Sequence, residues 1–380
     1  MSKLKTLLVG AGGYGALYAG YLLSGEFNDL QLAGVADPYA DRSEHYEKLK
    51  SSAPVYNDMA DFFNEQRADL TIISTPIHLH YDQCITALKN GSHVLCEKPL
   101  VPTVSDLDRL QAAFYDSNKI LAIGFQWCYS DVILAVKERI LAGEFGKPKS
   151  FKSYVSWPRN WAYYSRGVNW AGKIKTAEGA LVYDSVASNA TAHYIQNMLF
   201  LLGSSMEESA AITDIKAECY RANDIESFDT IIFKGRANNA DIFYTASHAT
   251  NYTVSPVMDY SFESARIWLN VIGQEWTMSI HHNDGRIENL GPGIGEGEKN
   301  RLHFISKRIK GEQATLCTVD TVRPITVLID MLFNEVPVMN FPSDQVVIDQ
   351  QEEVTYVKNL HLDLWDCFQQ NKLLSEFIRG

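Results

Sequence analysis

The stretch "KTLLVGAGGYG" (residues 5–15) joins a short, apolar, strand-like run to the glycine pattern G-x-G-x-x-G. Between a predicted strand and a predicted helix, this pattern favours dinucleotide binding over a glycine-rich turn without a ligand. Gly10 permits the tight turn, Gly12 lets the backbone approach a pyrophosphate at the helix N-terminus, and Gly15 lets helix and strand pack closely. The candidate cofactor contacts in this loop are Gly10, Gly12, Gly13, Tyr14 and Gly15.

Asp37 is the second element of the dinucleotide pattern. It ends the strand-like run "LQLAGVAD" (30–37), 22 residues after Gly15, where an acid can bond the adenosine ribose hydroxyls. A carboxylate there repels a ribose 2′-phosphate, so we expect NAD as the cofactor, with NADP as the less favoured alternative. Arg42 lies nearby in "DPYADR" and keeps that alternative open.

The first 125 residues alternate strand-like and helix-like segments. In "SDLDRLQAAFY", for example, Leu107, Leu110 and Phe114 recur at helical spacing. Such alternation predicts βαβ units and a doubly wound parallel sheet over residues 1–125. The further strand-like runs are "LQLAGVAD", "ADLTIIST" (68–75), "HVLCEKP" (93–99) and "ILAIGF" (120–125).

The pattern changes after Phe125, where a helix is predicted over 130–142 and further helices near 189–202 and 359–377. Between them lie the longer β-rich runs "KSFKSYVSW", "DTIIFKG", "DIFYTASHAT", "YSFESARIWLNVIG" and "EWTMSIHH". We therefore predict an α+β domain with a large, mainly antiparallel sheet over 126–380. The glycine-rich piece 291–300 is predicted as a surface loop.

Charge and composition exclude several classes of protein. The net charge of −12 argues against general binding to nucleic acid or anionic membrane. No apolar run reaches the roughly 20 residues of a membrane span, and nothing resembles a signal peptide. The six scattered cysteines form no CxxC pair, which predicts reduced thiols in a cytoplasmic protein. The motif "HHND" (281–284) predicts no metal site, because adjacent histidines in a strand point to opposite faces.

The run "HVLCEKPL" (93–100) places Glu97 and Lys98 after a predicted strand. In an open parallel sheet, ligands lie outside the carboxyl ends of the strands, so Lys98 can reach a nicotinamide region there. Its ammonium would stabilise a developing alkoxide, and Glu97 could orient it or contact the cofactor. By itself the triplet could equally be a solvated Lys–Glu pair before a helix.

Together, "VGAGGYG", "STPIHLHYDQCITALKNGSHVLCEKPL" (74–100) and "GFQWCYSDVILAVKERILAGEFGKP" (124–148) resemble the Gfo/Idh/MocA (glucose–fructose oxidoreductase / inositol dehydrogenase) family. The resemblance covers about the first 150 residues. It implies a Rossmann domain, then a sheet domain that often forms a homo-oligomer interface, a tightly held nicotinamide cofactor and carbohydrate substrates. It gives Lys98 the family's lysine position, whereas Ile77 replaces a frequent asparagine. Positions that it implies line the cofactor are Ser74, Thr75, Pro76, His80, Glu97 and Gln126.

The stretch "YDSVASNATAH" (183–193) holds the candidate proton acceptor. The family usually carries D-x-x-x-H at the start of a helix; counted from the helix end, the histidine is His193 and the acid position holds Asn189. Counted from the preceding "GAL", the acid is Asp184. A histidine suits proton removal near neutral pH, and a carboxylate partner would raise its basicity. Either Asp184 reaches His193, or Asn189 binds substrate; alternatively Asn189 only caps the helix and His193 is packed.

Aromatic and arginine side chains are concentrated in "SWPRNWAYYSRGVNWAGK" (156–173). Buried aromatics at the edge of a core are the usual explanation for such density. The run lacks clean periodicity and contains Pro and Gly, which favours an irregular loop over a cleft that binds sugar rings and hydroxyls or a carboxylate. Candidate substrate contacts here and elsewhere are Tyr129, Arg159, Trp161, Tyr163, Tyr164, Arg166, Trp170, Asn189 and His193.

These patterns predict an NAD(P)-dependent oxidoreductase for a secondary hydroxyl of a sugar, glycoside or cyclitol. Lys98 would hold the hydroxyl and His193 would move its proton, with Asp184 as the third catalytic candidate. Oxidation of a glycoside to its 3-keto form is one version of this prediction. The alternatives are a redox-neutral glycosidase that keeps its NAD, and a catalytically inactive regulator that senses NAD or sugar.

Overall fold

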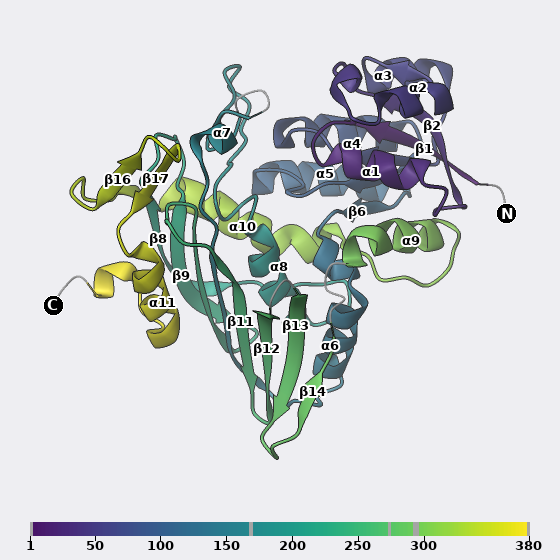
Figure 1. Cartoon of the computed structure of the whole chain (residues 1–380). Coiled ribbons are helices and arrows are strands. Elements are labelled where there is room, and N and C mark those ends of the chain that lie inside the picture. The colour runs from purple at the N-terminus through teal and green to yellow at the C-terminus, as the bar shows by residue number, and fades with distance from the viewer. Residues whose placement is uncertain (1–2, 167–169, 273–274, 292–295, 378–380) are drawn as a thin grey trace. The chain divides into compact units, whose positions relative to one another are not determined.

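The chain forms two compact units (Figure 1). The first consists of Met1–Tyr129 and Glu296–Arg323, and the second of Ser130–Gly295 and Pro324–Gly380. A computed structural model describes residues 3–166, 170–272, 275–291 and 296–377.

The first unit contains a six-stranded sheet in the order β3-β2-β1-β4-β5-β6. Every neighbouring pair is parallel, which confirms the predicted doubly wound sheet. Its strands are β1 (Leu4–Val9), β2 (Leu30–Ala36), β3 (Val55–Tyr56), β4 (Leu70–Ile73), β5 (His93–Cys96) and β6 (Leu121–Ile123). Central strands read as continuous apolar runs because helices bury both faces of a parallel sheet; Leu7 and Leu8 of β1 have no exposed surface.

Five helices connect these strands: α1 (Gly15–Leu23), α2 (Tyr46–Ser52), α3 (Met59–Glu65), α4 (His80–Lys89) and α5 (Val104–Ser117). Helix α5 is the helix predicted from the spacing of its apolar residues, and its Leu107 and Leu110 are fully buried. Its first turn is capped by Thr103, whose hydroxyl oxygen accepts a hydrogen bond from the Asp106 N–H at 3.1 Å.

The segment Glu296–Arg323 belongs to the first unit, whereas the sequence predicts a second domain that is continuous over 126–380. It contains α9 (Gly297–Ile309) and the start of α10 (Val319–Glu335), whose Pro324 opens the next segment of the second unit. Of the predicted loop 291–300, residues 297–300 form the first turn of α9, and 292–295 lie outside the described residues. Lys310, just after α9, donates to Asp29 at 2.9 Å, a pairing that local composition does not reveal.

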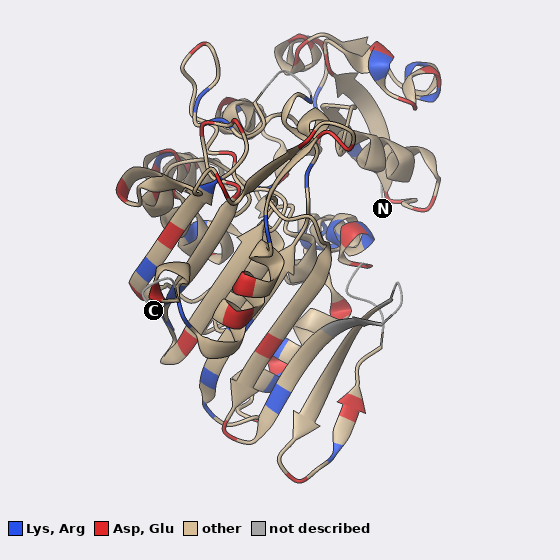
Figure 2. Ribbon diagram, turned by 60° about the vertical axis from the view of Figure 1, so that its left-hand side comes forward, with Lys and Arg blue, Asp and Glu red and all other residues tan. Residues whose placement is uncertain are grey.

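The second unit contains a nine-stranded sheet in the order β14-β13-β12-β11-β7-β10-β9-β8-β15. It is mainly antiparallel, as predicted, with parallel pairs only at β7·β10 and β8·β15 among the described strands. Charged residues are scattered among uncharged ones along these strands (Figure 2). The strands are β7 (Pro148–Ser156), β8 (Thr213–Arg221), β9 (Thr230–Ala237), β10 (Ala240–Ser247), β11 (Val254–Phe262), β12 (Ala265–Ile272), β13 (Glu275–His282), β14 (Ile287–Asn289) and β15 (Val338–Asn340).

Helices pack on both faces of this sheet. On β10, Phe243 belongs to the apolar cluster formed with α11 (Leu360–Gln370). The next residue, Tyr244, donates its hydroxyl hydrogen to the Thr191 hydroxyl at 2.6 Å, just before α8 (Ala192–Leu201). Successive strand residues point to opposite faces, so α8 and α11 cover opposite sides. A separate two-stranded sheet pairs β16 (Val346–Asp349) with β17 (Val354–Val357).

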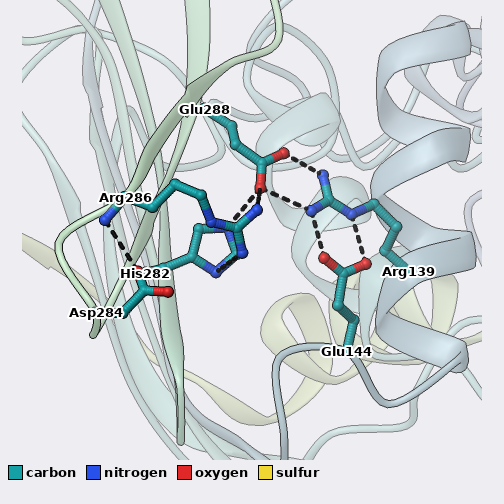
Figure 3. A network of polar contacts seen from close by, with 6 residues as sticks. All are labelled: Arg139, Glu144, His282, Asp284, Arg286 and Glu288. Atoms are coloured by element: carbon teal, nitrogen blue, oxygen red, sulfur yellow. Dashed lines mark hydrogen bonds and ion pairs between the residues drawn. The ribbon is translucent and has the colours of Figure 1, made fainter.

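An ionic network fastens the edge strand β14 to α6 (Asp131–Leu141), the helix predicted over 130–142 (Figure 3). Arg139 of α6 donates to Glu288 of β14 at 3.0 Å. Glu288 also contacts the His282 ring at 2.6 Å and accepts from Arg286 at 2.9 Å. The hydrogen bonds from Arg139 and His282 lower the pKa of the Glu288 carboxyl to about 2.

Candidate cofactor and substrate sites

The glycine loop follows β1 and opens α1, as its pattern predicted. Gly10 has φ +84°, and a Cβ built on it would lie 2.4 Å from the Ser74 carbonyl oxygen. A Cβ on Gly15 would lie 2.2 Å from the Gly10 carbonyl oxygen. A Cβ on Gly12 would meet nothing within 4 Å, and Gly12 is exposed. Gly10 and Gly15 thus serve the packing of the loop, whereas the free space at Gly12 suits the approach of a ligand.

Asp37 follows β2 and is tied to the glycine loop. One carboxylate oxygen accepts from the Ala11 N–H at 2.8 Å, and the other accepts from the Tyr39 N–H at 2.8 Å. These two bonds fix the carboxylate at the carboxyl edge of the sheet, where an adenosine ribose would bind. Arg42 is the residue that leaves NADP as an alternative cofactor. Its guanidinium carbon lies 4.5 Å from the centroid of the exposed Tyr39 ring.

The turn after β4 carries four predicted cofactor contacts. Ser74, Thr75 and Pro76 are half-buried, whereas His80 is only 1% exposed. The two ring nitrogens of His80 lie 2.8 Å from the Pro99 carbonyl oxygen and 2.9 Å from the Thr75 carbonyl oxygen. Burial lowers the pKa of this imidazole. His80 therefore ties the turn after β4 to the turn after β5.

Glu97 and Lys98 follow β5, the strand next to β4. Glu97 is 6% exposed and accepts from the Tyr18 hydroxyl at 2.7 Å and from the Lys98 N–H at 3.1 Å. Lys98 itself is half-buried. A Cβ on Gly124 would lie 2.6 Å from Glu97 Oε1, so a larger residue there would displace the carboxylate.

Arg301 of α9 completes this cluster, although no motif in the sequence marks it as a site residue. Its side chain has no exposed surface, and it donates to Glu97 Oε1 at 2.6 Å and to the Tyr14 hydroxyl at 3.0 Å. Tyr14 in turn contacts Gln126 through its hydroxyl, at 3.2 Å. One guanidinium thus touches two predicted cofactor contacts directly and a third through Tyr14. A lone arginine in a charged helical stretch gives no signal of such a role, because its partners lie far away in the sequence.

The charges in this cluster are buried but balanced. Burial alone lowers the pKa of the Arg301 guanidinium, but the neighbouring Tyr18, Glu97 and Tyr14 groups raise it above its usual range. Burial raises the pKa of the Tyr18 hydroxyl well above its usual value. The ring of Tyr18 also lies 4.4 Å from the Arg301 guanidinium carbon, a cation–π contact.

In the second unit, Asp184 and Asn189 contact each other. Asp184 is 2% exposed; its carboxylate accepts from the Asn189 side-chain amide at 2.9 Å and from the Gly172 N–H at 2.6 Å. The sequence leaves Asp184 and Asn189 as alternative partners for His193, whereas in the structure the two side chains are hydrogen-bonded to each other. His193 is half-buried and is the second residue of α8. The N-cap of α8 is Thr191, so Asn189 does not cap this helix.

The aromatic–arginine run is irregular apart from the short helix α7 (Trp161–Tyr164). The Trp161 indole N–H donates to the Thr355 hydroxyl at 3.0 Å, so this ring is tied to β17. Among the described residues the buried Tyr164 hydroxyl has no hydrogen-bond partner, and burial raises the pKa of this phenol. The Arg166 guanidinium carbon lies 3.5 Å from the Tyr163 ring centroid. Arg166 forms no ion pair with any described carboxylate, which leaves its charge available to a ligand.

His248, directly after β10, is a further polar residue beside this run. It is 2% exposed, and its Nδ1 lies 2.8 Å from the Trp157 carbonyl oxygen. The other ring nitrogen is buried without a partner in the described part of the chain. Burial, followed by the charge of Arg159, lowers the pKa of this imidazole to about 3. A neutral ring can therefore offer an acceptor next to Tyr163, whose ring centroid lies 5.7 Å away.

Tyr129 differs from the other substrate candidates. Its side chain has no exposed surface, and its hydroxyl donates to the Ile123 carbonyl at 2.9 Å and accepts from the Cys317 N–H at 3.2 Å. Both contacts lie within the first unit and connect the end of β6 to the returning segment. These contacts give Tyr129 a packing role, and its contact with substrate stays a prediction.

Neither a metal cluster nor a membrane helix is found in the described ranges. No three His, Cys, Asp or Glu side chains there are grouped so that they could hold a metal ion. In "HHND", His281 contacts Ser279 at 2.9 Å and His282 contacts Glu288. The described helices include none with the length and apolar character needed to cross a bilayer.

Comparison with known proteins agrees with this geometry. Residues 4–125 match the model of the GFO_IDH_MocA oxidoreductase family, NAD-binding Rossmann fold. An inositol 2-dehydrogenase from Salmonella paratyphi B is 30% identical over 147 residues, which are 38% of this chain and 44% of the relative. The scyllo-inositol 2-dehydrogenase (NADP(+)) IolW from Bacillus subtilis is 26% identical over 242 residues, 62% of each chain. The matches to these two curated relatives thus span about half of their length.

Solved structures have a similar fold over most of the chain. The WlbA dehydrogenase from Bordetella pertussis, in complex with NADH and UDP-GlcNAcA, has a TM-score of 0.72 and 20% identity, over 87% of this chain and 95% of that one. KijD10, a 3-ketoreductase from Actinomadura kijaniata, has a TM-score of 0.70 and 17% identity, over 90% and 100%. At these identities the likeness establishes the fold alone. The family match alone assigns residues 4–125 to the NAD-binding Rossmann domain of the Gfo/Idh/MocA oxidoreductases, as the motifs predicted.

Proposed function

We propose that the protein is an NAD-dependent oxidoreductase that transfers hydride between a secondary hydroxyl of a sugar, glycoside or cyclitol and nicotinamide. The observation that carries this proposal is the carboxyl edge of the first sheet. There the glycine loop, Asp37 and Lys98 follow β1, β2 and β5, strands of one parallel sheet. Ligands of open α/β sheets bind at this edge.

The proposed cofactor site uses the loop and the acid. Gly12 leaves room for a pyrophosphate beside the N-terminus of α1, and Asp37 holds the adenosine ribose hydroxyls. Asp37 also disfavours a 2′-phosphate, so we propose NAD rather than NADP. When bound, nicotinamide supplies the hydride acceptor.

The proposed chemistry divides two tasks between two residues. The Lys98 ammonium binds the substrate hydroxyl oxygen and stabilises the negative charge that develops there. His193 would take the hydroxyl proton, and a bound nicotinamide would supply the acceptor for the hydride of the same carbon, so that the overall reaction gives ketone, NADH and one proton. Asp184 and Asn189, bonded to each other before α8, shape the approach to His193.

The proposed substrate class rests on the relatives and on the second unit. Two of the relatives are named for inositols, and one solved neighbour holds a nucleotide-linked acidic sugar. Arg166, without a described ion pair, and the Tyr164 hydroxyl, without a described partner, would bind the oxygens of such a ligand. We also propose a cytoplasmic homo-oligomer formed through the large sheet; light scattering that gives the mass of one chain would contradict the oligomer.

The test is incubation of purified protein with NAD or NADP and a panel of inositols, sugars, uronates and glycosides. We expect NADH and a keto product in equal amounts, and loss of turnover in Lys98→Ala and His193→Ala. Lys299→Ala is the matched control, because Lys299 contacts Glu26 at 3.0 Å and the Tyr21 ring at 5.9 Å, both outside the proposed site. Free sugar without net NADH would instead indicate redox-neutral glycoside cleavage. Cofactor binding without turnover of any compound would favour a sensor.

A further inference from the structure

We propose that Arg301 is a positioning residue that fixes both the cofactor loop and the lysine turn. This inference rests on the proposed function, because it assigns the geometry of Lys98 and Tyr14 to a residue outside the motifs. Arg301 lies in α9, and its partners Glu97 and Tyr14 precede it by 204 and 287 residues.

Burial of the charged Arg301 guanidinium costs free energy. A guanidinium without exposed surface is stable only when it is paired and hydrogen-bonded. Arg301 has one carboxylate, Glu97 at 2.6 Å, one carbonyl, Gly124 at 3.3 Å, and one hydroxyl, Tyr14 at 3.0 Å. Apolar residues of the same volume would fill this space without the cost of burying a charge. Stability alone therefore does not explain why an arginine occupies this position.

The contacts of Glu97 suggest that reason. Its Oε1 is held by Arg301 and Tyr18, and its Oε2 accepts from the Lys98 backbone N–H at 3.1 Å. The carboxylate therefore has little freedom, and it holds the backbone of the residue after it. In this way Arg301 acts on Lys98 through Glu97, without reaching the substrate itself.

A second route leads from Arg301 to the glycine loop. Tyr14 is 41% exposed, yet its hydroxyl accepts from Arg301 and contacts Gln126 at 3.2 Å. Its ring lies 5.1 Å from the guanidinium carbon. The same charge thus restrains the loop that would hold the pyrophosphate and the residue after β6 that is a candidate cofactor contact.

The test compares NADH affinity, measured by fluorescence titration, with kcat at saturating cofactor. Because a misplacement of about 1 Å can cost a hundredfold in rate, we expect Arg301→Met to weaken NADH binding and to lower kcat, each by roughly tenfold to a hundredfold. Arg301→Lys keeps the charge and should recover part of both losses. Lys299→Met on the same helix removes a surface ion pair with Glu26 and a cation–π contact with Tyr21, and should match the wild type.

Two further variants separate positioning from stability. Arg301→Met with Glu97→Gln leaves no uncompensated charge and should restore folding, whereas kcat should stay low because the ion pair that fixes the side chain at position 97, and through it the Lys98 N–H, is lost. Gly124→Ala keeps the Arg301 side chain and should still lower kcat, because the new Cβ would lie 2.6 Å from Glu97 Oε1 and displace the carboxylate from Arg301 and from the Lys98 N–H. Wild-type kcat and NADH affinity in the double variant or in folded Arg301→Met would overturn the inference.

The two proposals fail in different ways. A wild-type protein that binds NADH but turns over no compound contradicts the proposed function only, and the NADH affinities still decide the role of Arg301. A wild-type protein that binds no NADH overturns both.

Discussion

Alanine variants of Gly12 and Gly15 should distinguish the role of the glycine loop in folding from its role in cofactor binding. In Gly15→Ala, the new Cβ would lie 2.2 Å from the Gly10 carbonyl oxygen, where ordinary contact begins at 3.4 Å. Helix α1 must therefore move away from the loop by about 1 Å, and such overpacking costs about 1–3 kcal/mol. In Gly12→Ala, the Cβ meets nothing within 4 Å, so we expect wild-type stability.

Both variants should nevertheless lose NADH affinity, for different reasons. The Cβ at Gly12 occupies the space that a pyrophosphate needs, whereas Gly15→Ala shifts the helix N-terminus that faces it. Urea unfolding gives the stability, and fluorescence titration with NADH gives the affinity. The reasoning is refuted if Gly12→Ala is destabilised as much as Gly15→Ala, or if Gly12→Ala binds NADH as the wild type does.

Three more predictions follow from single carboxylates. Asp37→Ala should raise kcat/KM for NADP relative to NAD by roughly tenfold. This factor corresponds to the loss of about 1.4 kcal/mol of repulsion between the carboxylate and the 2′-phosphate. Steady-state kinetics with both cofactors test this. Asp184→Asn should lower the free energy of unfolding by about 1–3 kcal/mol, because a buried N–H loses its acceptor; an unchanged urea midpoint would contradict it. Glu288 has a pKa lowered to about 2 in the folded protein, so its contribution to stability is complete above pH 4.5 and disappears as the pH falls toward 2. Wild type should therefore lose more stability than Glu288→Gln between pH 5 and 2, as measured by urea unfolding at each pH.

The regular parts of the fold could be predicted because their signals are local. A strand, a glycine turn and a helix follow one another within "KTLLVGAGGYG", and β1 and α1 form there. Four of the five long β-rich runs each became one strand, whereas the fifth, "YSFESARIWLNVIG", forms a hairpin, with β11 ending at Phe262 and β12 beginning at Ala265. Helix α9 was missed because its first turn lies in a glycine-rich stretch that has the composition of a loop.

The sequence alone determined the doubly wound sheet, the mainly antiparallel second sheet and the motifs that mark the candidate cofactor residues. Each of these depends on spacing within a few dozen residues. Tertiary structure alone decided which side chains meet. It joined Asp184 to Asn189, buried Tyr129, and brought Arg301 to Glu97 across 204 residues of sequence. A buried ion pair depends on the complementary positions of two charges in space, and no periodicity along the chain encodes that distance.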